Sequence, residues 1–132
     1  MKRQGLKLLL FFMVAMIAGT PACWAKKTAY GYLIAYSSRD QVVYYTPVFT
    51  QRVSGASYSD EEYVAQTSNI IKLEADFQAY LERTYRIDSA NFTVSARASY
   101  KTQEIAQDRL NEENGTFRFR GFQLIEVPNY AP

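Results

Sequence analysis

The stretch Tyr30-Gly-Tyr-Leu-Ile-Ala-Tyr36 decides how the chain can fold, because it is rich in strand-forming residues, namely three tyrosines and an isoleucine. Ser37-Ser-Arg-Asp40 follows with the composition of a turn, and a second strand-forming run occupies residues 41–50. The two runs predict a β-hairpin with a four-residue loop. Pro47 lacks an amide hydrogen, so we expect the second strand to lie at an edge or to bend there.

The segment after the hairpin is predicted to be a long helix. Ser59 and Glu62 have the spacing of a capping box, in which each side chain bonds a free amide at the start of a helix. Apolar residues then recur at helical spacing along the segment. We therefore expect a helix near residues 60–85 that buries Phe77 and Leu81 in the main core.

Three further elements complete the chain. Residues 92–100 alternate between apolar and polar side chains, which is typical of a half-buried strand. Residues 100–114 favour a short polar helix that Gly115 ends. Residues 116–127 form the last predicted strand, and we expect a bulge at Gly121, where the alternation changes phase.

The predicted order of elements is ββαβαβ, with one long and one short helix. A long helix needs a surface to cover, and the sheet is the one that this chain provides. We therefore expect an α+β fold in which both helices pack on one face of a small mixed or antiparallel sheet.

The beginning of the chain has the layout of a secretory signal peptide. Basic residues precede an uninterrupted apolar run at residues 8–19, and the small side chain of Ala25 suits cleavage before Lys26. The apolar run is shorter than the roughly 20 residues that a membrane span requires. We expect residues 1–25 to be removed, residues 26–132 to form a single domain, and the exported protein to be periplasmic or extracellular.

The single cysteine, Cys23, leaves an alternative open for the N-terminus. Cleavage just before Cys23 would leave a thiol that can carry a lipid, and the protein would then be anchored to a membrane. An uncleaved signal anchor is a further alternative. We expect contact with a membrane only if Cys23 is lipidated.

The composition of residues 26–132 limits the chemistry of the domain. They contain no His and no Cys, which excludes Ser-His-Asp and Cys-His nucleophiles and removes the commonest metal ligands. The acidic residues 60–62 and 112–113 are clustered at predicted helix ends, where carboxylates are solvated. We therefore predict no enzyme activity, no catalytic residue, no metal site and no cofactor. A hydrolase that uses two carboxylates is the least favoured alternative.

The charge balance of the exported domain bears on its partners. The formal net charge of +2 depends on Lys2, Arg3 and Lys7, all of which lie in the predicted leader. Without them the domain is slightly acidic, whereas binding to nucleic acid requires an excess of basic residues. We therefore expect no nucleic acid partner.

An excess of tyrosine is the positive signal for a binding site. If Leu33 and Val43 of the hairpin face the helices, its even-numbered tyrosines share the opposite face of the sheet. A tyrosine ring has an apolar body and a polar tip, which suits a wet recognition surface, and arginines could flank it. The predicted binding residues are Tyr30, Tyr32, Tyr36, Tyr44, Arg97, Arg118 and Arg120.

We expect a small exported, non-catalytic binding module that meets a protein or an envelope polymer with this Tyr/Arg face. The alternative is a structural or assembly component of the cell envelope that pairs through a sheet edge. The tyrosines also have a purely structural explanation, because cross-strand tyrosine pairs stabilise a sheet. If the tyrosines are buried, the binding hypothesis loses its site.

Overall fold

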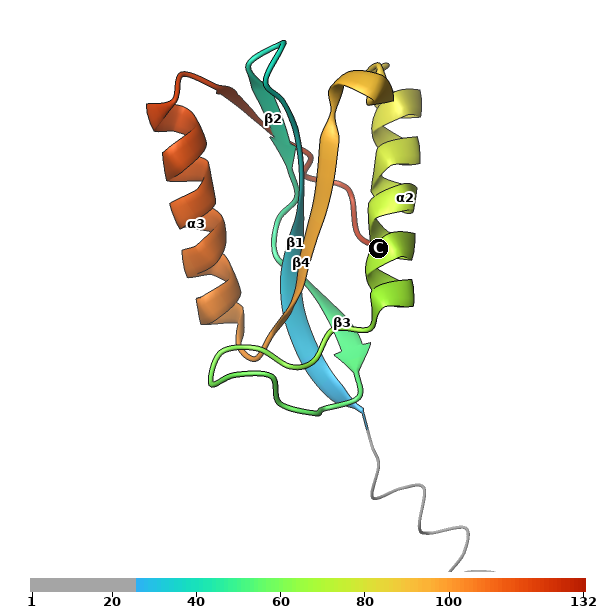
Figure 1. The fold of residues 1–132 in the computed structure, drawn as a ribbon, viewed down its shortest axis with the longest axis vertical. Helices are drawn as coiled ribbons and strands as arrows, with labels where there is room; N and C mark the ends of the chain where they lie inside the picture. Colours follow the sequence, from blue (N-terminus) through green and yellow to red (C-terminus); the bar gives the residue numbers. More distant parts are fainter. Residues whose placement is uncertain (1–25) are drawn as a thin grey trace, which may run out of the picture.

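The computed structural model describes residues 26–132, and the predicted signal peptide and Cys23 lie outside them (Figure 1). It confirms the α+β class, with a five-stranded mixed sheet and two α-helices in this part of the chain. The strands are β1 (Lys27–Ser37), β2 (Val42–Tyr45), β3 (Phe49–Val53), β4 (Thr93–Tyr100) and β5 (Gln123–Glu126). The helices are α2 (Thr67–Thr84), the 3₁₀ turn η2 (Ser89–Asn91) and α3 (Gln103–Phe119). Neither α2 nor α3 is long and apolar enough to cross a membrane.

Strand β1 is the centre of the sheet and pairs with strands on both sides. On one side, β2 pairs antiparallel with the C-terminal half of β1, and β3 pairs antiparallel with its N-terminal half. On the other side, β4 pairs antiparallel with β1. Strand β5 lies parallel to β2. Consequently β3, β4 and β5 each have one edge that pairs with no other strand of the described sheet.

The predicted second strand is divided into β2 and β3 by the segment Thr46-Pro47-Val48. Pro47 interrupts the ladder, so the bend expected there is confirmed. The buried Thr46 spans the gap: its N–H donates to the Leu33 carbonyl at 3.0 Å, and its hydroxyl accepts from the Leu33 N–H at 3.0 Å. The two short strands therefore remain attached to one continuous β1.

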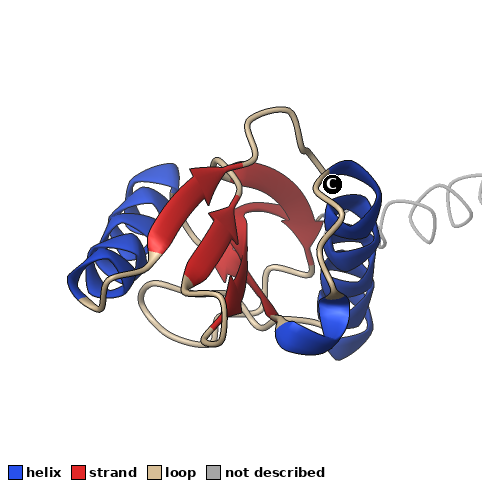
Figure 2. Cartoon of the chain, turned by 90° about the horizontal axis from the view of Figure 1, so that it is seen from above, coloured by secondary structure: helices blue, strands red, loops and turns tan. Residues whose placement is uncertain are grey.

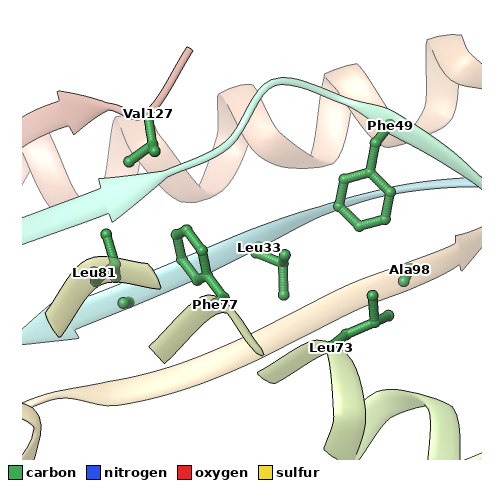
Figure 3. Packing of buried hydrophobic residues seen from close by; sticks show 8 residues of the cluster. Leu33, Phe49, Leu73, Phe77, Leu81, Ala98 and Val127 are labelled. Carbon is green, nitrogen blue, oxygen red and sulfur yellow. The ribbon is translucent and has the colours of Figure 1, made fainter. Parts of the chain in front are cut away.

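The prediction that both helices pack on one face of the sheet is wrong, because the helices cover opposite faces (Figures 1 and 2). Helix α2 packs Phe77 and Leu81 in a cluster that we call the α2-side core, as expected for these residues (Figure 3). Helix α3 packs Ala106 and Leu110 in the α3-side core. Residues 31–35 of β1 are all buried, so each face of the sheet needs a cover.

The sequence reasoning placed the two strands of the hairpin one residue out of register. Ala35 pairs with Tyr44, and Tyr36 pairs with Val43. Because directly paired residues point to the same face, even-numbered residues of β1 share a face with odd-numbered residues of β2. Tyr44 consequently packs against the α2-side core, whereas Val43 belongs to the α3-side core.

Residues 54–66 form a long loop and not the first turns of the helix. The Ser59 hydroxyl accepts from the backbone N–H groups of Glu61 and Glu62 at 3.2 and 3.1 Å, so the Ser59 half of the capping box forms locally. However, the Ser59 N–H donates back to the Glu62 carbonyl, and Glu62 pairs with Tyr100 at the end of β4. Pairing with the sheet thus replaces the predicted helical turns, and α2 begins only after this loop.

Helix α3 extends beyond its predicted end, and it stops at Gly121 instead of Gly115. Gly121 has a φ of 86°, in the left-handed region. Its N–H donates to the Arg118 carbonyl, and the Phe122 N–H donates to the Phe117 carbonyl, both at 3.0 Å. The Phe117 and Phe122 rings lie 5.1 Å apart. This is a Schellman motif with its hydrophobic contact, so the phase change at Gly121 marks a helix end and not a bulge in a strand.

The last residues of the chain complete the α2-side core. Val127 follows β5 and is fully buried in this cluster (Figure 3). The Tyr130 ring lies 5.1 Å from the Phe77 ring and 4.8 Å from the Tyr80 ring. The C-terminal segment therefore crosses to the α2 side after β5 and closes that core.

Two glycine substitutions test the position of the α3 stop. An added Cβ at Gly115 meets nothing within 4 Å, so we expect Gly115→Ala to raise the free energy of unfolding by about 0.5–1 kcal/mol. Gly121→Ala places a side chain in the left-handed region, and we expect a loss of about 1–2 kcal/mol. Urea unfolding of both variants measures the two effects. The opposite pair of signs would place the helix stop at Gly115.

Candidate functional site

The predicted tyrosine face of the hairpin is covered by α3. Tyr32 is fully buried, and Tyr30 and Tyr36 are half-buried against the same α3-side core. Tyr44 lies on the opposite face, where its ring packs 5.1 Å from the Tyr85 ring. The prediction of an exposed tyrosine surface shared by these residues is therefore wrong, for two reasons: α3 covers the face, and the hairpin register sends Tyr44 to the other side.

A groove on the β4 side of α3 nevertheless brings three of the predicted residues together, namely Tyr36, Arg97 and Arg120. Its volume is about 310 Å³, and we call it the β4 groove. Helix α3 packs mainly over β1 and β5, so the part of the face next to β4 stays open. Ser95 of β4 contributes to the floor of the groove, and Phe117 of α3 contributes to its wall.

Aromatic rings form one end of the β4 groove. The rings of Tyr36 and Phe117 lie 5.2 Å apart, and Phe117 in turn contacts Phe122. The guanidinium of Arg120 lies 5.3 Å from the centre of the Phe122 ring, which is a cation–π contact. This end of the groove therefore combines an apolar platform with a positive charge.

An ion pair and a buried hydroxyl form the other end, one helical turn back along α3. Arg97 Nε lies 3.3 Å from Glu113 Oε1, and both side chains are partly exposed. Arg97 is in register with Tyr32, whose buried hydroxyl lies near the Tyr100 and Glu113 side chains but makes no hydrogen bond of good geometry with any residue of 26–132. Burial raises the pKa of Tyr32 well above its ordinary value, and the negative charge of Glu113 raises this pKa further. Glu113 thus has two groups within its reach, the Arg97 guanidinium and the Tyr32 hydroxyl.

Arg118, the remaining predicted residue, lies on the other side of α3. There it lines a second groove, about 400 Å³ in volume, between α3 and strands β2 and β5. We call this the β5 groove. Asn114 of α3 and Tyr45 of β2 also line it, and neither was predicted from the sequence. Asn114 follows Leu110 by four residues, so it lies on the buried stripe of α3, and this spacing could have identified it. The spacing was missed because the helix was predicted to end at Gly115.

Arg109 forms an ion pair with one residue of each acidic cluster, Glu61 of 60–62 and Glu112 of 112–113. Arg109 Nη2 donates to Glu61 Oε2 at 2.5 Å, and Arg109 Nη1 lies 2.9 Å from Glu112 Oε2. These contacts fasten the loop 54–66 to the first half of α3. In the described part of the chain, no group of three or more Cys, Asp or Glu side chains is placed to hold a metal ion.

Comparison with known proteins supplies no relative from which a function could be transferred. No protein-family model, no curated protein and no solved structure matches this chain. The geometry and chemistry of the two grooves beside α3 are therefore the observations that bear on function.

The buried hydroxyl of Tyr32 leads to a stability prediction. Tyr32→Phe removes a hydroxyl that has no partner, so at about pH 7 we expect the free energy of unfolding to stay within about 1 kcal/mol of the wild type, or to rise. Since the pKa of folded Tyr32 lies above 10.0, the wild type loses stability as the pH rises beyond that value. The variant should lose less of it.

Urea unfolding at about pH 7 and about pH 11 measures both effects. Tyr58→Phe is the matched control, because Tyr58 is 75% exposed. A loss of more than about 2 kcal/mol in Tyr32→Phe at about pH 7 would mean that the hydroxyl holds a strong hydrogen bond.

Proposed function

We propose that the protein is a small exported, non-catalytic binding module that takes an extended, acidic segment of a partner protein along β4. The observation that carries this proposal is the position of the outer edge of β4, which borders a groove with an arginine at each end, Arg97 and Arg120. The edge offers backbone contacts, and the groove offers side-chain contacts.

The outer edge of β4 lacks the features that discourage strand addition. Strand β4 pairs with β1 alone among the strands of residues 26–132. Its C-terminal end is covered, because the Tyr63 N–H donates to the Ser99 carbonyl at 2.8 Å. Residues 93–98 contain no proline and a single charged residue, Arg97. An edge of this kind can pair with an extended peptide.

The register identifies the backbone groups that a peptide would meet. Leu33 directs its N–H and carbonyl toward Thr46, so its neighbour Ile34 directs its own toward Ser95 of β4. Backbone direction alternates along a strand, and Val94 and Ala96 therefore direct their N–H and carbonyl groups outward. These are the groups available for strand addition.

The β4 groove would receive alternate side chains of the added strand. Arg97 and Arg120 outweigh the single carboxylate of Glu113, which favours acidic side chains in the partner. A carboxylate that binds Arg97 releases Glu113, and Glu113 can then accept the hydrogen bond of the Tyr32 hydroxyl. Binding would in this way satisfy a buried group that has no partner in the free protein.

A second candidate function uses the same edge. Strand β4 of one copy could pair with β4 of another, which would make the protein a structural or assembly component of the cell envelope. Sedimentation of the exported protein separates the two functions. A stable dimer that forms without peptide favours assembly, and a monomer that binds peptides favours the binding module.

The binding proposal predicts the outcome of selection from a displayed library of extended peptides. We expect enrichment of sequences with Asp or Glu at alternate positions, and Arg97→Gln and Arg120→Gln should each weaken their binding by about tenfold. Ala96→Pro removes an outward N–H without breaking the ladder to β1, so it should abolish binding while the fold is kept. Arg83→Gln on α2 is the control. Binding that is unaffected by Ala96→Pro would contradict the proposal.

Export predicts a defined N-terminus. When the full chain is expressed in a bacterial host, the intact mass of the exported protein should correspond to a chain that begins at Lys26. A mass that includes lipidated Cys23 would place the protein on a membrane. Retention of the uncleaved chain in the cytoplasm would contradict export.

A further inference from the structure

Asn114 occupies a position of α3 that the helix geometry assigns to an apolar residue. Ala106, Leu110 and Asn114 follow one another at intervals of four residues and are all buried. Asn114 is only 8% exposed, and its Oδ1 has no hydrogen-bond partner in the described part of the chain. A buried amide without a hydrogen-bond partner lowers the stability of the fold, whereas a leucine at the same position would not. A bound ligand that hydrogen-bonds to this amide would explain why an asparagine is present.

The β5 groove shows what kind of ligand would satisfy Asn114. The polar side chains that line it are Tyr45, Gln107, Asn111, Asn114, Arg118 and Glu126. Tyr45 and Glu126 are register partners on β2 and β5, so they stand side by side opposite the amides of α3. Gln107 Nε2 donates to Asn111 Oδ1 at 3.0 Å, which holds these two amides together on the surface of the helix.

We propose that the β5 groove binds a neutral saccharide. Each sugar hydroxyl both donates and accepts a hydrogen bond, and each carboxamide of the groove does the same. The Tyr45 ring offers an apolar face for the C–H groups of a sugar ring and a polar tip for its hydroxyls. Oδ1 is shielded from solvent in the free protein, so a sugar hydroxyl bound beside Asn114 supplies its missing partner when the carboxamide turns toward the groove.

The charges of the groove favour a neutral ligand over the alternatives. Arg118 and Glu126 carry opposite charges, so they cancel. A phosphorylated ligand would require an excess of positive charge. A hard metal ion would require several oxygen ligands with carboxylates among them, and Glu126 is the single carboxylate of this lining.

This site is separate from the β4 groove, because it lies on the opposite side of α3 and shares no lining residue with it. The saccharide could be a free sugar or one unit of an envelope glycan. The length of the bound oligosaccharide distinguishes these sources, since a polymer site makes contacts with several units.

The experiment is a titration of the ¹⁵N-labelled exported protein with N-acetylglucosamine oligomers and with cello-oligosaccharides, from monosaccharide to hexamer. We expect the side-chain amide signals of Asn111 and Asn114 to shift. Affinity that rises at least tenfold from monomer to hexamer identifies a polymer site, and equal affinity identifies a free sugar. If neither amide shifts with any of these probes, the proposal is overturned.

Substitution of Asn114 separates a ligand-binding role from a structural one. Asn114→Leu continues the apolar stripe, so we expect a urea midpoint at least as high as that of the wild type and an affinity at least tenfold lower. Asn111→Ala should weaken binding without entering the core. Asn129→Ala, at an exposed asparagine, is the matched control.

Two results would refute the site even if the sugars bind. One is unchanged affinity in both Asn114→Leu and Asn111→Ala. The other is a large loss of stability in Asn114→Leu, which would mean that the amide already has a partner in the protein. The Ala96→Pro variant should bind saccharide normally, so failure of the peptide site and failure of the saccharide site remain distinguishable.

Discussion

The burial of β1 on both faces is the constraint on which the rest of the structure depends. Leu33 and Ala35 point to one face, and Tyr32 and Ile34 point to the other. Each face must be removed from water, so the chain places one helix on each side of the strand. At Gly31, an added Cβ would lie 2.3 Å from Ala98 Cα, so this residue must be glycine for β4 to approach β1 so closely.

The position of α3 over the sheet creates both candidate sites. Helix α3 is too narrow to cover the whole face, and it packs along β1 and against β5. The parts of the face that it leaves open are the β4 groove on one side and the β5 groove on the other. Arg118 and Arg120 are close in sequence but lie on opposite sides of α3. They consequently line different grooves.

Local periodicity was the part of the fold that could be predicted from the sequence. The hairpin, the alternation in residues 92–100 and the burial of Phe77 and Leu81 all follow from spacing within one element. The register of the hairpin depends on how the turn is closed, and a shift of one residue moved Tyr44 to the wrong face. Ser59 shows a related limit, because a capping motif can form without a helix behind it.

The candidate site was harder to predict than the fold, because its members come together only through the placement of α3. Tyr36, Arg97 and Arg120 were identified as binding residues, yet the exposed sheet face that was to unite them does not exist. Asn114 could have been predicted from the sequence if the helix had been expected to continue past Gly115. It would then have been a polar residue on an otherwise apolar, buried stripe.

The closing of the α2-side core by the C-terminal segment has a consequence for the timing of folding. Val127 and Tyr130 contact residues of β1 and α2 that were synthesised far earlier. Because synthesis runs from the N-terminus, Val127 and Tyr130 are made after the strand and the helix that they cover. The α2-side core therefore stays incomplete until residues 127–130 are made, so shorter nascent chains leave the apolar faces of β1 and α2 in contact with water.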